Sequence, residues 1–149
     1  MMTSMGAYSH LFVDSGAYIA LADRSDVNHK AARTFLVDLG PSIQRVTSWG
    51  VVAETYTWLR YHLRTDVASR WLGAMEATIA AGTTQLVRPD PELDAMCRKQ
   101  LLRFADHALS YVDGLTLAIL QVESRIDAIF GFDRRHMALS GLPVLPATP

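Results

Sequence analysis

Short apolar runs alternate along the chain with longer segments whose apolar residues recur at helical spacing. The short runs predict buried strands over Leu11–Val13, Ile43–Thr47, Thr83–Val87, Ala128–Phe132 and Pro143–Leu145. The longer segments predict helices over Ala17–Ala22, His29–Leu39, Trp49–Leu63, Asp66–Ala80, Pro91–Phe104, Tyr111–Glu123 and Arg134–Leu139. Strands that alternate with helices predict a parallel sheet covered by helices on both faces, so the pattern indicates an α/β chain.

Capping residues mark the starts of several predicted helices. Asn28, Ser48 and Ser110 stand directly before helical segments, where a side-chain oxygen can accept a hydrogen bond from the first turn. Gly82 and Gly141 stand where the helices before them stop. The chain shows no linker and no internal repeat. We therefore expect a single domain over residues 1–149, with flexible ends at 1–9 and 146–149.

The composition is that of a globular chain with a core. Of the 149 residues, 50% are hydrophobic and 19% are charged, which is far from a disordered composition. The formal net charge of −1 argues against broad electrostatic attraction to nucleic acid, although it allows a local basic patch. The single cysteine, Cys97, excludes an internal disulfide and fits a small packed side chain. No signal-peptide or membrane-spanning pattern occurs, so we expect a cytoplasmic protein.

Four acidic residues lie beside the apolar segments, although they are far apart in the sequence. Asp14 and Asp133 fall at the carboxyl ends of predicted strands, and Glu54 and Asp113 fall in the first turns of predicted helices. Ligands bind at that edge of an open α/β sheet, so the four can converge on one cleft. Clustered carboxylates repel one another, and Mg²⁺ or Mn²⁺, which prefer oxygen ligands, would relieve the repulsion.

Each of these acids also has a purely structural interpretation when it is taken alone. Asp14 can form a turn after a strand, and Asp133 can cap the short helix that follows it. Asp113 follows Ser110 at the spacing of a capping box, and Glu54 can be an exposed helical residue. The joint placement of the four at one edge of the sheet is what favours a shared site.

The segments that carry the four acids resemble the PIN-domain family, and within it the VapC-type ribonucleases of toxin–antitoxin pairs. The matching segments are Leu-Phe-Val-Asp14-Ser15, Thr47-Ser48 with Val-Val-Ala-Glu54-Thr, Leu109-Ser110-Tyr-Val-Asp113-Gly-Leu-Thr-Leu-Ala-Ile, and Phe132-Asp133-Arg134-Arg135-His136. The resemblance extends from about His10 to Leu145. The segment around Asp113 is the most specific part of it.

The resemblance implies a fold, an activity and a set of site residues. The fold would be a three-layer α/β/α sandwich with a central parallel sheet, and the activity would be metal-dependent hydrolysis of RNA. Asp14 and Asp113 would bind Mg²⁺ or Mn²⁺ directly, and Glu54 and Asp133 would complete the shell directly or through water. Ser15 would hydrogen-bond within the pocket as a supporting group.

Two positions depart from the family pattern. Gly131 stands where many members carry a Thr or Ser two residues before the fourth acid, so a hydroxyl is missing there. Gly16 follows Ser15 where a hydroxyl or apolar residue is frequent. Neither departure removes a carboxylate.

Two arginines and a histidine follow the fourth acid. We expect Arg134 and Arg135 to hold the phosphate backbone of the RNA substrate, because cations are needed there. His136 is the one of five scattered histidines that can reach a phosphate beside Asp133. The chain has no Gly-x-Ser-x-Gly elbow and no Cys/His dyad, which suits hydrolysis by a metal-activated water.

The resemblance also implies two protein partners. Proteins of this type are typically homodimers, and a cognate antitoxin protein would cover the acidic cleft. The apolar helices over Trp49–Leu63 and Asp66–Ala80 offer a surface for a second copy, although core packing explains their aromatic residues equally well.

Other classes of protein with acids at strand ends fit the chain less well. A phospho-acceptor receiver domain needs a late lysine after a strand, and the only lysines are Lys30 and Lys99. A haloacid-dehalogenase-like phosphatase needs Asp-x-Asp, where this chain reads Asp14-Ser15-Gly16. A dinucleotide site needs Gly-x-Gly-x-x-Gly, which is absent. The remaining alternative is a non-catalytic PIN-like module that binds a partner.

Overall fold

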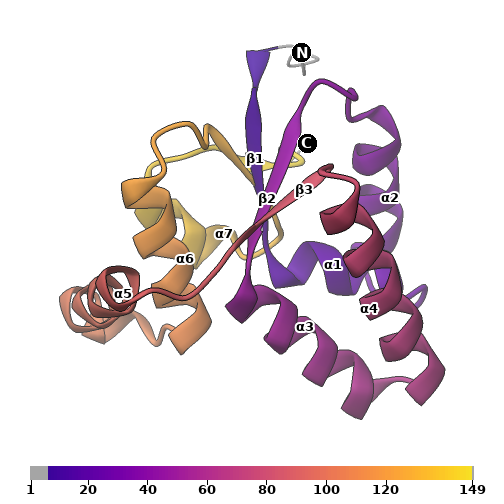
Figure 1. Ribbon diagram of the computed structural model, residues 1–149, viewed down its shortest axis with the longest axis horizontal. Helices are drawn as coiled ribbons and strands as arrows, with labels where there is room; N and C mark the ends of the chain where they lie inside the picture. The colour runs from indigo at the N-terminus through magenta and orange to yellow at the C-terminus, as the bar shows by residue number, and fades with distance from the viewer. Residues whose placement is uncertain (1–6, 149) are drawn as a thin grey trace.

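The strands of the sheet all run parallel, and their order places β1 at its centre (Figure 1). The order across the sheet is β3 (Thr84–Val87), β2 (Gln44–Ser48), β1 (His10–Val13), β4 (Ala128–Phe130) and β5 (Val144–Leu145). The computed structural model describes residues 7–148. Residues 1–6 and 149, which belong to the ends expected to be flexible, lie outside this described part.

Helices cover both faces of the sheet, which confirms the predicted three-layer α/β/α sandwich (Figure 1). One face carries α1 (Ser15–Ala22), α2 (His29–Asp38), α3 (Trp49–His62) and α4 (Thr65–Ala80). The other carries α5 (Pro91–Arg103), α6 (Tyr111–Val122) and α7 (Arg134–Met137), with 3₁₀ turns η2 (Ala105–His107) and η3 (Ala138–Ser140). Crossovers between parallel strands are right-handed, so the chain changes face once, when it returns from β3 to place β4 beside β1.

The predicted strands and helices are all present, and their boundaries agree with the prediction within two residues. Strand β4 ends at Phe130, two residues earlier than predicted, because the chain turns there toward the start of α7. The helix predicted over Arg134–Leu139 is split into α7 and η3, and it ends at Gly141 with φ 77°. The short turn η2 was not predicted.

Two expectations about helix starts are wrong. Glu54 lies in the second turn of α3, because the helix begins at Trp49 directly after the Ser48 cap. Asn28 precedes α2, but its side chain makes no capping hydrogen bond. Its backbone has φ −97° and ψ 3°, outside the extended conformation that a capping side chain needs. Instead, the Asn28 N–H donates to the Asp26 carboxylate at 2.7 Å.

The serine caps form as predicted. The Ser48 hydroxyl accepts a hydrogen bond from the Val51 N–H at 3.1 Å, which fixes the start of α3 at the carboxyl end of β2. Ser110 caps α6 in a reciprocal arrangement described with the site below. The start of α5 is fixed by Asp90, whose carboxylate accepts from the Leu93 N–H at 2.9 Å. These caps hold helix starts at the edge of the sheet where the acids were expected.

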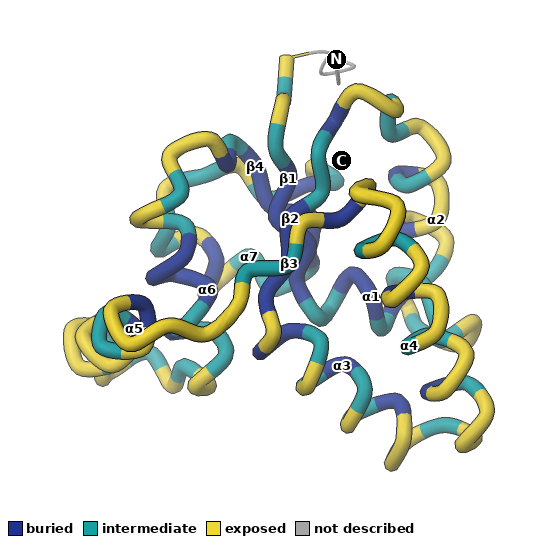
Figure 2. The backbone as a smooth tube through the Cα atoms, viewed as in Figure 1, coloured by how far each residue is buried: buried dark blue, intermediate teal, exposed yellow. Residues whose placement is uncertain are grey.

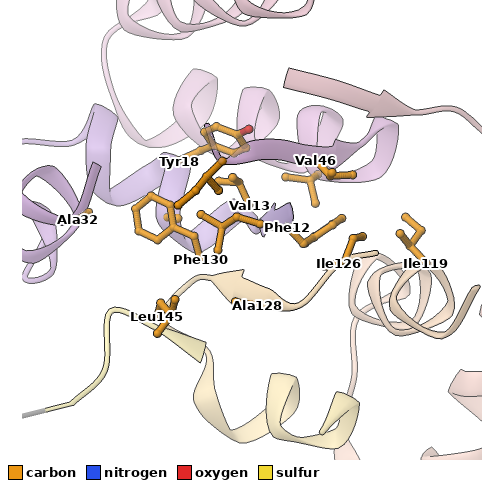
Figure 3. Close-up of a cluster of buried hydrophobic side chains, with 14 of the residues drawn as sticks. Phe12, Val13, Tyr18, Ala32, Val46, Ile119, Ile126, Ala128, Phe130 and Leu145 are labelled. Atoms are coloured by element: carbon orange, nitrogen blue, oxygen red, sulfur yellow. The ribbon is translucent and has the colours of Figure 1, made fainter. Parts of the chain in front are cut away.

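The hydrophobic core lies on both sides of the sheet. Val13 and Phe130 occupy neighbouring strand positions and pack with Tyr18 of α1, and Phe35 of α2 lies 4.6 Å from the Phe130 ring between centroids (Figure 3). Phe12 alternates to the opposite face of the sheet. Figure 2 shows buried residues along the strands and exposed residues on the outer sides of α2, α4 and α5. The core therefore fixes the strand ends that carry the site.

Helices α5 and α6 approach each other closely at Gly114. A methyl group added to Gly114 would lie 2.6 Å from Cγ of Leu101, closer than two carbon atoms can approach. Gly73 is also a helical glycine, but nothing lies within 4 Å of a methyl group added there. The two glycines form a natural comparison between a packing requirement and plain helix propensity.

We expect Gly114→Ala to lower the free energy of unfolding by about 1–3 kcal/mol, because it overpacks the contact between α5 and α6. Gly73→Ala should raise it by about 0.5–1 kcal/mol, because glycine weakens an exposed helix relative to alanine. Urea denaturation of both variants measures the two effects. A stabilised Gly114→Ala variant would contradict the close approach of the helices.

Candidate functional site

Asp14 stands at the point where the strand order of the sheet reverses. Strands β2 and β3 lie on one side of β1 and strands β4 and β5 on the other, so the crossovers leave β1 and β4 in opposite directions. Asp14 directly follows β1, and its backbone N–H donates to the Phe130 carbonyl at the end of β4 at 2.9 Å. Such a switch point leaves a crevice at the carboxyl ends of the strands, which is where α/β sheets bind ligands.

The Asp14 carboxyl group is buried, with 4% of the residue exposed. Burial raises its pKa to about 7, because a carboxylate loses its hydration inside the protein. The Ser15 backbone N–H faces the carboxylate and opposes part of this rise, although Asp14 makes no helix-capping hydrogen bond with α1. The negative charges of Asp113, Glu54 and Asp133 raise the pKa further. The structure therefore brings the four predicted acids together around Asp14.

Asp113 is held at the start of α6 by a capping box. The Ser110 hydroxyl accepts from the Asp113 N–H at 3.1 Å, and Oδ2 of Asp113 accepts from the Ser110 N–H at 3.0 Å. Asp113 therefore forms the capping box that its spacing from Ser110 predicted. The same bonds aim the partly buried carboxylate at the site, because Oδ2 of Asp113 lies 3.6 Å from Nδ1 of His136.

Asp133 and His136 form a second fixed unit across the first turn of α7. Oδ1 of Asp133 accepts from the His136 N–H at 3.2 Å, which caps the helix as expected. Oδ2 of Asp133 lies 2.9 Å from Nδ1 of the His136 imidazole. The His136 side chain is 20% exposed. Its contact with two of the acids was missed from the sequence, where the three-residue spacing from Asp133 was the available signal.

Glu54 approaches the site from α3 and also lines a groove along that helix. This aromatic groove is formed by Trp49, Gly50, Ala53, Glu54, Thr57, Trp58, Tyr61, His62 and Val112 and encloses about 480 Å³. Trp58 and His62 stack within it, with ring centroids 4.4 Å apart. The second turn of α3 places Glu54 between the acids and this groove. A surface of aromatic rings therefore begins directly beside the candidate site.

The donor groups of this cluster fit a divalent cation. Side-chain ligand atoms of Asp113, Asp133 and His136 all lie within 4.8 Å of one another. Asp14 adds a buried carboxylate whose charge is disfavoured by its neighbours, which is the condition that a bound cation would relieve. The carboxylates of this cluster suit Mg²⁺ or Mn²⁺ in type. The assignment of individual ligands stays a prediction.

The two arginines after Asp133 lie in different surroundings. Arg134 is half-buried, and its guanidinium donates to the Val144 carbonyl at 2.9 Å and to the Pro146 carbonyl. Arg135 is exposed, and among residues 7–148 it takes part in none of the ion pairs. The guanidinium of Arg135 is therefore the one that solvent and a polyanion can reach.

Gly131, which stands in place of the expected hydroxyl residue, lies against Asp14. A methyl group added to Gly131 would lie 3.3 Å from Cβ of Asp14 and 3.7 Å from its Oδ2. The Gly131 N–H still donates to the Leu145 carbonyl at 3.0 Å, so the backbone is held in the sheet. A side chain here would compete with Asp14 for space.

Comparison with known proteins supports the fold. No protein-family model matches the sequence, and no curated protein matches it either. Among solved structures, the chain is similar to VapC20 of Mycobacterium tuberculosis, a toxin that cleaves the sarcin-ricin loop, with a TM-score of 0.76. The similarity covers 87% of this chain and 94% of that chain at 22% sequence identity. At this identity the likeness establishes a shared PIN-like α/β/α fold.

Among the described residues, no helix is both long and apolar enough to cross a membrane.

The raised pKa of Asp14 predicts a pH dependence in the metal-free protein. The group loses its proton near its ordinary value of 3.8 in the unfolded chain but near 7 in the folded protein, so the folded state holds the extra proton between these values. The free energy of unfolding should therefore fall as the pH rises from about 4 to about 7 and stay level above. A shift of roughly three units corresponds to a loss on the order of 4 kcal/mol.

Asp14→Asn should remove this loss, because the amide stays neutral. In EDTA the variant should match the parent near pH 4 and be more stable near pH 8. Urea denaturation of both proteins across that range measures the difference. Asp106→Asn is the control, because the Asp106 side chain is 87% exposed and should leave the pH dependence unchanged. A difference between parent and Asp14→Asn that does not grow with pH would rule out a buried charge.

Proposed function

We propose that this chain is a metal-dependent endoribonuclease that hydrolyses RNA phosphodiester bonds and acts as the toxin of a type II toxin–antitoxin pair. The proposal rests on the burial of Asp14 at the switch point of the sheet, with the charges of Glu54, Asp113 and Asp133 around it. A cation that compensates these charges makes such a cluster tolerable. The fold shared with VapC20, a toxin that cleaves the sarcin-ricin loop, supports RNA as the substrate.

The four acids would bind the cation in different ways. Asp14 and Asp113 are proposed as direct ligands of Mg²⁺ or Mn²⁺, and Glu54 and Asp133 complete the shell directly or through water. Ser15 supports the Asp14 carboxylate through its backbone N–H. A bound divalent cation supplies positive charge beside the scissile phosphate and lowers the pKa of the attacking water. The carboxylates orient that water for in-line attack.

No side-chain nucleophile is needed in this proposal. Cys97 is fully buried, and its thiol donates to the Tyr111 carbonyl at 3.5 Å, so it faces away from solvent. Burial raises the pKa of the Cys97 thiol, which disfavours the reactive thiolate. Water activated beside the acids is therefore the attacking group that the chain can best provide.

Arg135 and Arg134 are proposed to hold the RNA backbone. Arg135 is exposed beside Asp133 and can pair with a phosphate through its whole guanidinium fork. Arg134 has N–H donors committed to the Val144 and Pro146 carbonyls, so it would contribute mainly its positive charge. The near-neutral chain thus concentrates cationic charge where the substrate must lie.

A homodimer and an antitoxin complete the proposal for a cytoplasmic toxin. The aromatic groove is the proposed surface for a second copy, because Tyr61 is 81% exposed and Trp49 is 58% exposed there. Trp71 of α4, in the second of the two helices expected to face a second copy, packs against Tyr18 with ring centroids 5.5 Å apart, so core packing accounts for it. An antitoxin would cover the acids and exclude the RNA.

We expect the purified protein to cleave RNA in Mg²⁺ or Mn²⁺ and to lose all cleavage in EDTA. A sarcin-ricin loop hairpin and an unrelated single-stranded RNA are suitable substrates, with products resolved on a denaturing gel. Restoring the cation after EDTA treatment should restore cleavage. Cleavage that survives complete chelation would refute metal-dependent hydrolysis. Cation binding without any cleavage would favour a non-catalytic binding module instead.

Asp113→Asn separates the catalytic from the purely structural role of this residue. The amide keeps an oxygen for the Ser110 N–H and removes one of the mutually repelling charges. In EDTA the variant should be at least as stable as the parent, and it should cleave no RNA. Thermal melting and the cleavage assay on the same preparation measure both effects.

Asp90→Asn is the matched control, because the Asp90 carboxylate also accepts a backbone N–H at a helix start, as the N-cap of α5, and is not among the charges that raise the pKa of Asp14. It should lose about 0.3–1 kcal/mol from the weakened helix-dipole interaction and keep full activity. If Asp113→Asn behaves like this control, Asp113 serves only as a cap and its proposed catalytic role is wrong.

A further inference from the structure

The imidazole of His136 faces two of the four acids. Its Nδ1 lies 2.9 Å from Oδ2 of Asp133 and 3.6 Å from Oδ2 of Asp113. Asp113 comes from the start of α6, and Asp133 and His136 come from the first turn of α7. Three potential ligand atoms from two helices therefore converge, and one of them is nitrogen.

Backbone N–H groups fix the two carboxylates independently of any bound ion, and the imidazole is held by its contact with Asp133. Oδ1 of Asp133 is occupied by the His136 N–H, which turns Oδ2 toward the imidazole. The Asp113 carboxylate is held by the Ser110 N–H. The His136 and Asp113 side chains are 20% and 16% exposed, so little freedom is left to either. The cluster is pre-organised rather than assembled by chance contact of mobile side chains.

The separations between the three atoms match those of ligands around one small cation. Ligand atoms bound at about 2.1 Å and at right angles to one another lie about 3.0 Å apart. The distances of 2.9 and 3.6 Å from Nδ1 bracket that value. A cation placed between these atoms would replace the shared proton that joins Nδ1 of His136 to Asp133.

We propose that His136 is itself a metal ligand, which together with Asp113 and Asp133 makes a mixed nitrogen and oxygen site. Imidazole is a good ligand for first-row transition ions, whereas Mg²⁺ prefers carboxylate and water oxygens. His136 therefore tilts the preference of the site toward Mn²⁺ over Mg²⁺. This inference rests on the proposed function for the place of the cation, but it can be tested without RNA.

The competing interpretation is that His136 only donates a hydrogen bond to Asp133 and orients it. Both interpretations keep the carboxylates in place, so loss of activity on mutation would not separate them. They differ in whether nitrogen is bonded to the metal. A bonded nitrogen shares spin density with Mn²⁺, which pulsed electron paramagnetic resonance detects directly.

The decisive measurement uses the full chain loaded with Mn²⁺ near pH 8. We expect a ¹⁴N coupling to the bound ion, replaced by a ¹⁵N coupling when the protein carries ¹⁵N-labelled histidine. His136→Asn should abolish this coupling and weaken Mn²⁺ binding by at least about 10-fold, since loss of a group that only orients a ligand already costs that much. Mg²⁺ binding, measured by its displacement of Mn²⁺, should change by less than about threefold.

His107→Asn provides the matched control. His107 also lies beside an acid, with Nε2 3.6 Å from Oδ1 of Asp106, but it stands on η2 and shares no contact with the four acids. It should leave the nitrogen coupling and both affinities unchanged. The spectrum of the unmutated protein decides the question even if His136→Asn fails to fold.

The inference is overturned if the unmutated protein binds Mn²⁺ without a histidine nitrogen coupling, or if it binds no Mn²⁺. It is also overturned if His136→Asn weakens Mn²⁺ and Mg²⁺ binding by the same factor. Nitrogen-coupled Mn²⁺ in a protein that cleaves no RNA would uphold the ligand assignment and refute the nuclease. RNA cleavage by a protein whose bound Mn²⁺ shows no nitrogen coupling would uphold the nuclease and refute His136 as a ligand.

Discussion

The whole arrangement depends on keeping one carboxyl group, that of Asp14, buried at the centre of the sheet among like charges. Its backbone N–H is bonded to the Phe130 carbonyl at the end of β4, so the residue is fixed where the central strand β1 meets its neighbour. Burial and the neighbouring acids raise its pKa to about 7. The fold therefore carries a stored electrostatic cost that only a proton or a cation can relieve.

The remaining groups of the site are fixed by secondary structure, which explains why ordinary capping residues can also be functional ones. Asp133 accepts the His136 N–H with Oδ1 and faces the site with Oδ2. Asp113 uses Oδ2 for both purposes, because this oxygen accepts the Ser110 N–H and also lies beside the His136 imidazole. A cap holds a side chain in one orientation at little conformational cost. Precision of this kind is what a metal site requires from its supporting structure. The structural and functional interpretations of these acids are thus compatible rather than exclusive.

The order of strands and helices could be predicted from the sequence, because the periodicity of Leu11–Val13 and of Trp49–Leu63 reports burial directly. The convergence of four acids also followed, since carboxyl ends of parallel strands share one edge. The helix start at Trp49 was predicted correctly, and it already places Glu54, the sixth helical residue, in the second turn, so the expected first-turn position was a miscount and not a limit of the sequence. The contact of His136 with Asp113 depends on the packing of α7 against α6, which no local spacing encodes. The difference between Arg134, which is bonded to carbonyls in and after β5, and the exposed Arg135 likewise depends on where that strand lies.

Arg134 has a consequence for the outer edge of the sheet. Strand β5 is the last strand of the sheet, and the carbonyls of Leu145 and of Pro143, just before the strand, accept hydrogen bonds from the N–H groups of Gly131 and Ile129. The alternate carbonyls, those of Val144 and Pro146, accept from the Arg134 guanidinium. A strand from another chain would need those acceptors to extend the sheet. The guanidinium thus opposes the addition of a further strand beside β5, which is how edge-to-edge aggregation begins. The short helix that carries Asp133 and His136 therefore also protects this edge of the sheet.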